Sequence, residues 1–294
     1  MRRLAIFMTG QYRHFWMSWN NLVEKIITPL SPHFDISLSI GMDKKWKQRN
    51  GSLLWSQEDM GEFEEKMRNE WSVVLNKPAE NLIIEWMDTS NPFFQSAVAS
   101  LRHYVNTKRL SEYWFNYLVH RSGSCVEYAQ FARLYEIYEK KFQIADEDLL
   151  MRTRCDILLR HPFNINKLPL TENVFQQLVP TSTLFENYVE KEGYENSIHP
   201  TAIIPDRWAI TFRKNLVYIM PLKSAKIVMD VAIHYGDWDS VGNNTYWFNA
   251  ESQFRGCLRF LQFRVWEHSQ SKDECYEANF DDLEDDFPIY AIKR

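Results

Sequence analysis

Short apolar runs alternate with helical stretches at the start of the chain, and this order constrains the fold more than any other feature. The run Leu4–Met8 has the length of one buried strand. A helical stretch follows to about Ile27, and Pro29 and Pro32 are expected to end it. Residues 34–40 then alternate with a period of two, which is typical of a second strand. A strand, a helix and a strand in this order predict an α/β fold with a mostly parallel sheet flanked by helices.

The following segments extend this prediction. Residues 82–87 predict a third strand, and residues 146–159 predict a buried strand that a polar, charged turn interrupts. Between them, Ser124 and Glu127 form a capping box that opens a helix. Its aromatic residues recur at helical spacing and are expected in the core: Tyr128, Phe131, Tyr135, Tyr138 and Phe142. Helices are also expected within residues 43–75, 93–121, 213–233 and 250–261, and strands at 174–179, 207–212 and 262–266.

Composition excludes several classes of protein. The 294 residues include 34 Lys and Arg against 39 Asp and Glu, and the formal charge of −5 argues against a protein that coats nucleic acid. Only 9 residues are glycine, which disfavours a glycine-rich nucleotide-binding loop. Aromatic residues make up 15% of the chain; rings can stack on sugars and bases, but a large aromatic core is the simpler interpretation. The acidic stretch 273–286 is expected to be a solvated tail or loop.

The sequence carries no sign of membrane insertion or of an oxidising compartment. The apolar run near the N-terminus has only about five residues, too few for a signal peptide. No segment has the ~18–20 apolar residues of a membrane span. None of the four cysteines belongs to a C-x-x-C pair, which argues against a zinc finger and favours reduced thiols. We therefore expect a cytoplasmic protein, at most peripheral to a membrane, with one domain over residues 1–294.

The segment Arg152–Asp156 is the most informative one for function. Its sequence is Arg-Thr-Arg-Cys-Asp, so three formal charges stand at the end of a strand that is otherwise apolar. Buried charges are unfavourable unless they are paired or bind a ligand. Ligands of parallel α/β sheets bind beyond the carboxyl ends of the strands, where arginines can pair with phosphate and an aspartate can hold a divalent cation. The alternative is an internal ion pair between arginine and aspartate at the strand end.

The turn after the first strand, from Thr9 to Arg13, is a second candidate site. Backbone N–H groups at a strand-to-helix turn can bind phosphate or base edges. Gly10 permits a close approach of the ligand, Arg13 can pair with a diphosphate, and Gln11 can contact a base or ribose. The alternative is an ordinary turn with an arginine at the surface.

These segments resemble a known family. Arg152–Asp156 resembles the R-x-R-x-D signature of GT-A-type glycosyltransferases, especially the WavE-like lipopolysaccharide glycosyltransferases, in which a strand delivers the aspartate to the position of a D-x-D motif. Further stretches are similar in the family's order: Ile6–Arg13, Gln130–Tyr138, Pro205–Ile210 and Asn249–Glu251. The sequence departs from the family at Arg154, which replaces the first aspartate of D-x-D, and at Thr211, which replaces a glycine.

The resemblance implies a GT-A-like domain that moves a sugar from a nucleotide-sugar donor to a hydroxyl group of a glycan, glycolipid or glycoprotein acceptor. Residues 1–160 would form the nucleotide-binding half and residues 161–294 the acceptor-side half. The resemblance also implies a divalent cation, Mn²⁺ or Mg²⁺, with Asp156 as its ligand. The residues implied in donor binding are Thr9, Gly10, Gln11, Arg13, Arg152, Arg154 and Asp156.

Transfer with inversion needs a base that deprotonates the acceptor hydroxyl, and Asp206 and Glu251 are the candidate catalytic carboxylates. Glu251 stands at an expected helix start, where the helix dipole favours its charged form. Trp208 lies close to Asp206 in the sequence and is the candidate for stacking on an acceptor sugar. The alternatives are a surface turn at Asp206 and Arg207, and an ordinary helix-start residue at Glu251.

Other patterns compete with this assignment. The D-x-D string Asp146–Asp148 precedes its strand, at the sheet end opposite the expected ligand crevice, and the string Asp237–Asp239 is expected in a loop. His199 is a candidate late metal ligand, although no two histidines have the spacing of a zinc site. Two other functions stay open: a non-catalytic protein that binds carbohydrate or nucleotide on the same fold, and another nucleotide-handling α/β transferase.

Overall fold

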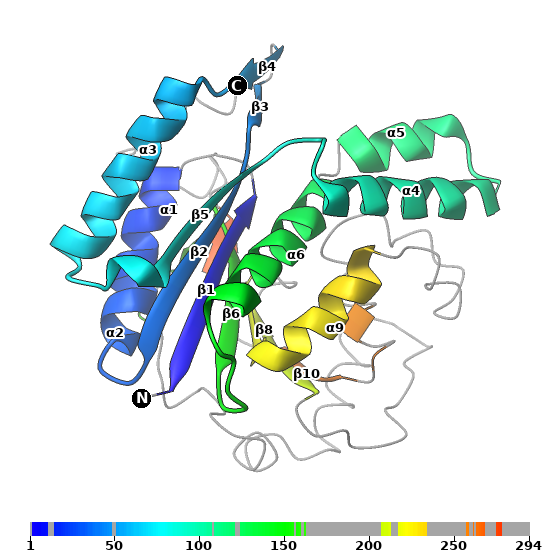
Figure 1. Cartoon of the computed structure of the whole chain (residues 1–294). Coiled ribbons are helices and arrows are strands. Elements are labelled where there is room, and N and C mark those ends of the chain that lie inside the picture. The colour runs from blue at the N-terminus through cyan, green and yellow to red at the C-terminus, as the bar shows by residue number, and fades with distance from the viewer. Residues whose placement is uncertain are drawn as a thin grey trace.

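A computed structural model of the chain shows a mixed α/β fold (Figure 1). It describes residues 2–10, 15–48, 51–107, 109–120, 124–155, 157–159, 162, 207–212, 217–233, 257–258, 261, 263–267 and 275–277. Within these residues, the main sheet has seven strands, which are parallel except for β9. In spatial order they are β10 (Arg264–Glu267), β8 (Trp208–Phe212), β9 (Val217–Pro221), β6 (Leu149–Arg154), β1 (Arg3–Gly10), β2 (Asp35–Asp43) and β5 (Leu82–Met87). The prediction of a mostly parallel sheet flanked by helices is confirmed.

Helices cover both faces of the sheet, which gives three layers (Figure 1). One face carries α1 (Phe15–Leu22), η1 (Val23–Ile27), α2 (Thr28–Leu30), α3 (Gln57–Asn69) and η2 (Glu70–Val74). The other face carries α6 (Ser124–Lys141) and α9 (Leu222–Ile233), with α4 (Pro92–Thr107) and α5 (Glu112–His120) packed beside α6. The short helix η3 (Ala79–Asn81) leads into β5.

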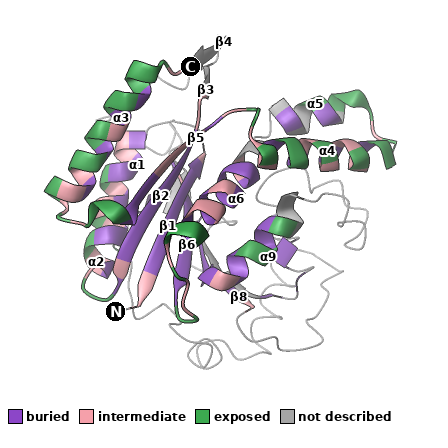
Figure 2. Ribbon diagram, viewed as in Figure 1, coloured by how far each residue is buried: buried purple, intermediate pink, exposed green. Residues whose placement is uncertain are grey.

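The central strands are buried on both faces, because alternate side chains enter two separate cores (Figure 2). In β1, Ile6 packs on the side of α1 and α3, whereas Phe7 packs on the side of α6. The ring of Phe7 meets the ring of Phe131 in an edge-to-face contact, with 5.4 Å between their centres. Trp19 and Trp71 are buried in the opposite core. Aromatic residues therefore contribute to both cores, as the composition predicts.

The first helix corrects one prediction, because Pro29 does not end it. The helix passes through a π turn at η1 and continues as α2 to Leu30. In the π turn, the N–H of Thr28 donates to the carbonyl of Val23. This wider turn accommodates the ring of Pro29, which has no N–H to donate. The other proline, Pro32, lies in the turn that does end the helix.

Several short strands are not predicted by the sequence. β3 (Lys45–Gln48) and β4 (Gly51–Leu54) form a hairpin before α3, within the charged stretch that was expected to be partly helical. β9 forms where a helix is expected, because its buried apolar side chains occupy the place between β6 and β8. β11 (Cys275–Glu277) pairs with β7 (Ile157–Leu159), so this part of the acidic stretch is a strand and not a solvated tail.

Most of the other predicted elements are confirmed. β1, β2 and β5 contain the first three expected strands, β6 and β7 form the interrupted one, and β8 and β10 are the later ones. α4, α5, α6 and α9 lie in the expected helical stretches. The expected strand at 174–179 and most of the expected helix at 250–261 lie outside the described residues. The division into a donor half and an acceptor half stays a prediction, because much of 161–294 also lies outside them.

Candidate functional site

The order of the strands defines where a ligand crevice can form. Along the chain, β1 is followed by β2 and β5 on one side, and the chain then crosses to β6 on the other side of β1. The strand order therefore reverses between β1 and β6, and ligands of such sheets bind outside the carboxyl ends of the strands at this switch point. The register pairs Thr9 with Arg154, so the two segments implied in donor binding end side by side.

The end of β1 has an unusual backbone conformation. Gly10 has a φ of 127°, which residues with a side chain rarely adopt. Its N–H donates a hydrogen bond of 2.9 Å to Oε1 of Gln130, and its carbonyl accepts one of 3.4 Å from Nε2 of the same side chain. Gln130 comes from α6 and is fully buried. The N–H of Cys155 donates to the carbonyl of Thr9 over 3.2 Å, which connects the ends of β1 and β6.

Arg152 is buried below the end of β6 and is only 3% exposed. Its Nε donates to Oγ1 of Thr9 over 3.3 Å, and its guanidinium carbon lies 5.6 Å from the centre of the Tyr218 ring. Burial raises the pKa of Tyr218 well above its usual value, so the ring beside this cation stays neutral. Arg152 also forms an ion pair with Glu127 in the first turn of α6.

The carboxylate of the predicted capping box belongs to Glu127, and in the structure it pairs with Arg152. A buried guanidinium needs such a counter-charge. The side chain of Ser124 lies outside the described residues, so the capping box itself stays a prediction. The pair also resembles the predicted alternative of an internal ion pair at this strand end, with a glutamate from α6 as the anion.

The other residues implied in donor binding differ in their surroundings. Arg154, the last residue of β6, is half-buried, whereas Thr9 is fully buried and accepts a hydrogen bond from Arg152. Gln11, Arg13 and Asp156 lie outside the described residues. The structure therefore brings Thr9, Gly10, Arg152 and Arg154 together, and the donor-binding role of all seven residues stays a prediction.

The residues expected on the acceptor side are mostly outside the described residues. These are the candidate catalytic carboxylates Asp206 and Glu251. Trp208 begins β8 and is 2% exposed, packed in the core on the side of α1 and α3. Its position agrees with the simpler interpretation of aromatic residues as core, and its stacking on an acceptor sugar stays a prediction. Arg207 donates to the carbonyl of Leu261 over 2.8 Å.

The competing string Asp146–Asp148 lies at the amino end of β6, as its place in the sequence predicts. Asp148 is buried and accepts hydrogen bonds from the N–H groups of Arg3 and Ala145, over 3.2 and 2.9 Å. Asp146 is exposed and lies 3.3 Å from Nζ of Lys223. Both carboxylates are thus at the edge of the sheet opposite Gly10 and Arg154. Asp237–Asp239 and His199 lie outside the described residues.

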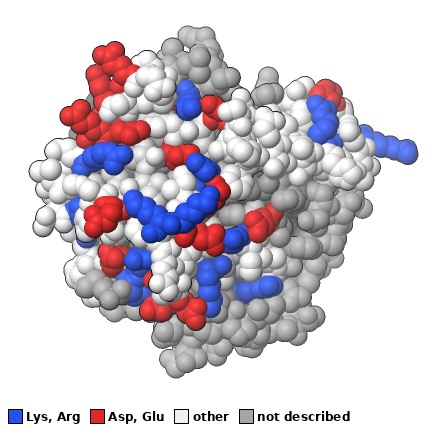
Figure 3. All heavy atoms as spheres, viewed as in Figure 1, with Lys and Arg blue, Asp and Glu red and all other residues white. Residues whose placement is uncertain are grey.

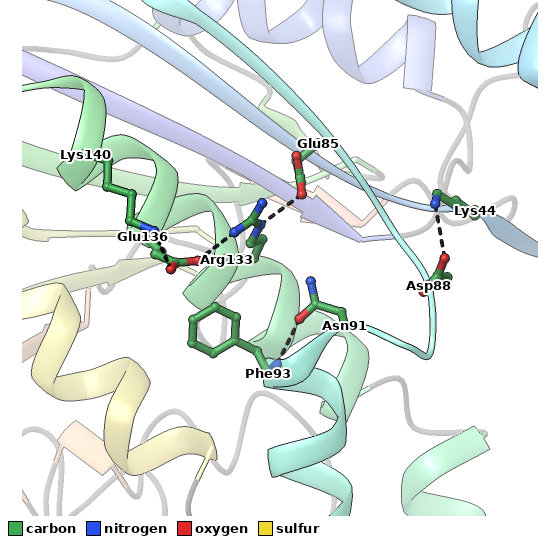
Figure 4. A network of polar contacts seen from close by, with 8 residues as sticks. All are labelled: Lys44, Glu85, Asp88, Asn91, Phe93, Arg133, Glu136 and Lys140. Atoms are coloured by element: carbon green, nitrogen blue, oxygen red, sulfur yellow. Dashed lines mark hydrogen bonds and ion pairs between the residues drawn. The ribbon is translucent and has the colours of Figure 1, made fainter.

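A second polar group at the carboxyl edge forms no motif in the sequence (Figure 4). Lys44 follows β2 and Asp88 follows β5, and they form an ion pair of 3.1 Å. Hydrogen bonds from the hydroxyl and N–H of Ser90, together with the one from Lys44, lower the pKa of Asp88 to about 2. The signal that could have found this group is simple: each residue directly follows a strand, and parallel neighbours end at the same edge.

The same view shows how α6 is fixed to β5 (Figure 4). Arg133 of α6 donates to Glu85 of β5 over 2.9 Å and to Glu136 over 2.7 Å. Glu136 also accepts a hydrogen bond of 2.7 Å from Lys140, which extends the network along the helix. These contacts raise the pKa of Arg133 and lower that of Glu136, because each favours the charged form of its partner.

The described residues show neither a metal-binding cluster nor a membrane-spanning helix. Within the described residues, no group of three or more His, Cys, Asp or Glu side chains has the arrangement of a metal site. The predicted ligand Asp156 lies outside these residues, so the cation stays a prediction. None of the described helices has the length and hydropathy needed to cross a bilayer. On the face of the molecule in Figure 3, acidic side chains gather over α3, and elsewhere the two signs of charge are mixed.

The sequence matches no protein-family model and no curated protein. Several solved structures are similar in three dimensions, and three of them, all sugar transferases, are described here. The galactosyltransferase LgtC, solved with donor and acceptor sugar analogues, is 10% identical, with a TM-score of 0.39 over 90% of this chain and 73% of that one. Mouse xyloside xylosyltransferase 1, without ligand, is 8% identical, with a TM-score of 0.41 over 96% and 99%.

The mannosyltransferase Ktr4p from S. cerevisiae, solved with GDP, is 10% identical, with a TM-score of 0.36 over 94% of this chain and 71% of that one. At such identities and TM-scores, the sugars and nucleotides of these proteins describe those proteins alone. The assignment of a function to this chain therefore depends on its own residues.

Proposed function

We propose that the protein is a nucleotide-sugar-dependent glycosyltransferase that transfers a sugar to a hydroxyl group of a glycan, glycolipid or glycoprotein acceptor. The observation that carries the proposal is the position of Arg154 at the end of β6, beside Thr9 of β1, at the switch point of the sheet. Sheets of this kind bind ligands there. The same two segments carry the sequence resemblance to WavE-like GT-A glycosyltransferases.

The chemistry of sugar transfer agrees with the residues at this point. The leaving diphosphate develops negative charge, which a fixed cation stabilises. Arg154 is suited to this task, because it is half-buried at the strand end and a guanidinium can donate two parallel hydrogen bonds to a phosphate. Arg152 contributes indirectly, since its charge is buried and matched by Glu127. In the proposal, Gln11 and Arg13 complete the donor site.

On the acceptor side, we assign Asp206 and Glu251 as the carboxylates that face the acceptor hydroxyl. If the anomeric centre is inverted, one of them acts as the base. Trp208, close to Asp206 in the sequence, anchors this segment to the sheet through its burial in the core. The proposal therefore divides the work between the end of β6, which binds the donor, and the segment before β8, which approaches the acceptor.

A divalent cation, Mn²⁺ or Mg²⁺, is part of the proposal, with Asp156 as its ligand. Such a cation neutralises a diphosphate and assists its departure. The test is to measure turnover in EDTA and after Mn²⁺ or Mg²⁺ is restored. Loss and recovery of turnover would support the cation, and full turnover in EDTA would remove it while leaving sugar transfer intact.

The activity itself is tested with a panel of UDP-, GDP- and CMP-sugars. Released nucleotide is measured without an acceptor, because a transferase often passes some donor to water, and then with glycan acceptors. The same nucleotides and S-adenosylmethionine are compared in thermal-shift measurements, since a ligand raises the midpoint of unfolding. A nucleotide that binds without any turnover would favour the non-catalytic alternative. A shift with S-adenosylmethionine alone would favour a different transferase.

Two aspartate variants test the location of the site. Asp156→Ala is expected to abolish donor turnover while the chain stays folded. Asp146→Ala is the matched control, because it removes an exposed carboxylate at the opposite edge of the sheet, where it pairs with Lys223. Asp146→Ala should keep full turnover. The reverse result would move the site to the amino edge, and full activity in both variants would remove the assignment of Asp156.

A further inference from the structure

Two side chains of α6 reach the ends of the strands that the proposed function assigns to the donor. Glu127 pairs with Arg152 of β6, and Gln130 binds the backbone of Gly10 in β1. The two residues are three positions apart, so they lie on the same face of the helix. We refer to Glu127 and Gln130 together as the α6 clamp.

Gln130 supplies the hydrogen-bond partners of Gly10, the last residue of β1. The carbonyl of Thr9 faces β6, where it accepts from the N–H of Cys155, and the peptide is trans, so the N–H of Gly10 points away from β6. Buried backbone polar groups need hydrogen-bond partners. The amide of Gln130 accepts from the N–H of Gly10 and donates to its carbonyl, and the side chain is fully buried. Two bonds from one amide hold the peptide at a φ that the chain would not adopt by default.

Glu127 holds β6, the strand beside β1, through its ion pair with Arg152. Its carboxylate stands in the first turn of α6, where the helix dipole favours an anion. Arg152, which it neutralises, also donates to Oγ1 of Thr9. The contacts from Glu127 to Arg152 to Thr9 therefore run from α6 through β6 to β1, directly below Gly10.

The clamp is effective because α6 is itself fixed to the sheet. A Cβ atom on Gly41 of β2 would lie 3.2 Å from Cδ1 of Leu134 and 3.3 Å from Cβ of Gln130, so the absence of a side chain there permits the close approach of the helix. Further along, Arg133 binds Glu85 of β5. A side chain that projects from such a fixed element holds its partner more exactly than one on a loop.

We propose that Glu127 and Gln130 are positioning residues of the donor site. They touch no donor; they hold the last residues of β1 and of β6, which the proposed function assigns to the donor site. The inference rests on the proposed function for its consequence, the binding of a nucleotide. Its mechanical part, the fixing of the end of β1 by α6, stands on the hydrogen bonds and the ion pair alone.

The decisive variant is Gln130→Met, which keeps the size of the side chain and removes both hydrogen bonds to Gly10. The matched control is Asn81→Leu, which removes another buried amide, one that donates to Asp35 and to the carbonyl of Ile36 at the amino edge. Both variants should lower the midpoint of thermal unfolding. Only Gln130→Met should weaken nucleotide binding, by about tenfold in Kd, the factor expected for one or two lost hydrogen bonds.

The nucleotide used is whichever of UDP, GDP and CMP raises the unfolding midpoint of the unmodified chain, and Kd is measured by calorimetry. Glu127→Gln should also weaken nucleotide binding, because it removes the counter-charge of Arg152. Glu139→Gln is its control on the same helix, since Glu139 is exposed and pairs with Lys226, away from β1 and β6. Equal Kd values in Gln130→Met and Asn81→Leu would show that the amide has only a general structural role, and would overturn the proposal.

Hydrogen exchange separates this inference from the proposed function. In Gln130→Met, the amide of Gly10 should exchange at least about tenfold faster, because its acceptor is gone, while amides of β2 keep their rates. Unchanged exchange at Gly10 would overturn the proposal whatever the chain binds. If the unmodified chain binds and turns over no nucleotide sugar, the proposed function fails. Exchange at Gly10 then still decides whether α6 holds the end of β1.

Discussion

The two edges of the sheet hold buried charge in different ways. At the amino edge, Asp148 is bound by Arg3 and by the N–H of Ala145, and Arg3 also lies 3.8 Å from Asp35. These charged groups pair with one another. At the carboxyl edge, a buried arginine is neutralised from the helix layer, and next to it Gly10 adopts a conformation that a buried amide maintains.

The difference indicates which edge stabilises the fold and which edge is suited to binding a ligand. Charged groups that pair with one another stabilise the fold and leave little unpaired charge to bind a ligand. A backbone conformation that only glycine adopts readily, held by a buried side chain, is the kind of feature that gathers at binding and catalytic sites. The observed conformation of Gly10 thus points to the carboxyl edge, where the strand order also reverses. Each of the following predictions tests whether the two edges differ in this way.

The largest expected effect is on stability, when the buried ion pair at the carboxyl edge is broken. Glu127→Ala leaves the guanidinium of Arg152 buried without a counter-charge, which costs about 3–5 kcal/mol of unfolding free energy. Arg152→Met should cost less, because the carboxylate left behind is 19% exposed and can be hydrated. Arg3→Met at the amino edge is the control. Urea unfolding gives the unfolding free energy of all three variants. Equal losses for Glu127→Ala and Arg152→Met would contradict the expectation that the unpaired guanidinium costs more than the unpaired carboxylate.

The next effect is on activity. Arg154→Ala should reduce donor turnover about 10²–10³-fold, the usual consequence of removing one group that stabilises transition-state charge. Arg68→Ala is the control, because Arg68 is exposed on α3 and pairs with Glu64 of the same helix. Initial rates of nucleotide release give the comparison. Similar rates for the two variants would mean that Arg154 does not contact the donor.

Gly10→Ala should destabilise the chain by about 1–3 kcal/mol, because alanine is strained at a φ of 127°. The obstacle is the conformation and not the space, since a Cβ at this position would be 3.8 Å from its nearest neighbour. Gly61→Ala provides a control of opposite sign. Gly61 lies in α3 with nothing near its Cβ position, so alanine should stabilise the helix by up to about 1 kcal/mol. Thermal unfolding of both variants tests this contrast.

The smallest effect concerns pH. Asp88 has its pKa lowered from 3.8 to about 2 in the folded chain, so its contribution to stability is present above pH 4 and is lost as the pH falls towards 2. Because about a third of the side chain is exposed, solvent screening keeps this contribution below about 1 kcal/mol. Asp88→Asn should flatten the dependence of the unfolding free energy on pH between 4 and 2. An unchanged profile would show that the contacts with Ser90 and Lys44 contribute nothing to stability.

The fold could be predicted from the sequence wherever the signal is local. Alternating or apolar runs identify β1, β2, β5 and β6, and helical spacing identifies α4 and α6. β9 and β11 were not predicted, because each pairs with a strand distant in the sequence, β6 in one case and β7 in the other. Pro29 was interpreted by its usual effect, whereas a π turn two residues earlier removes the conflict.

The candidate site likewise contains residues that the sequence predicts and residues that it does not. The ends of β1 and β6 lie side by side because of the strand order, which pairs Thr9 with Arg154, and both segments stand out in the sequence. The partners on α6 do not stand out, since Glu127 has the spacing of a capping residue and Gln130 resembles any polar residue on a helix. Only the packing of α6 across β1 and β6 gives these side chains their contacts, and that packing is a property of the assembled layers.

The pairing of β7 with β11 also bears on biosynthesis. β7 begins directly after Asp156, and its partner strand is Cys275–Glu277. A ribosome delivers the chain from its first residue, so the parallel strands on either side of β1 can assemble long before this partner emerges. β7 therefore gains its partner only after β11 has emerged, so the centre of the main sheet can be folded before the pair of β7 and β11 forms.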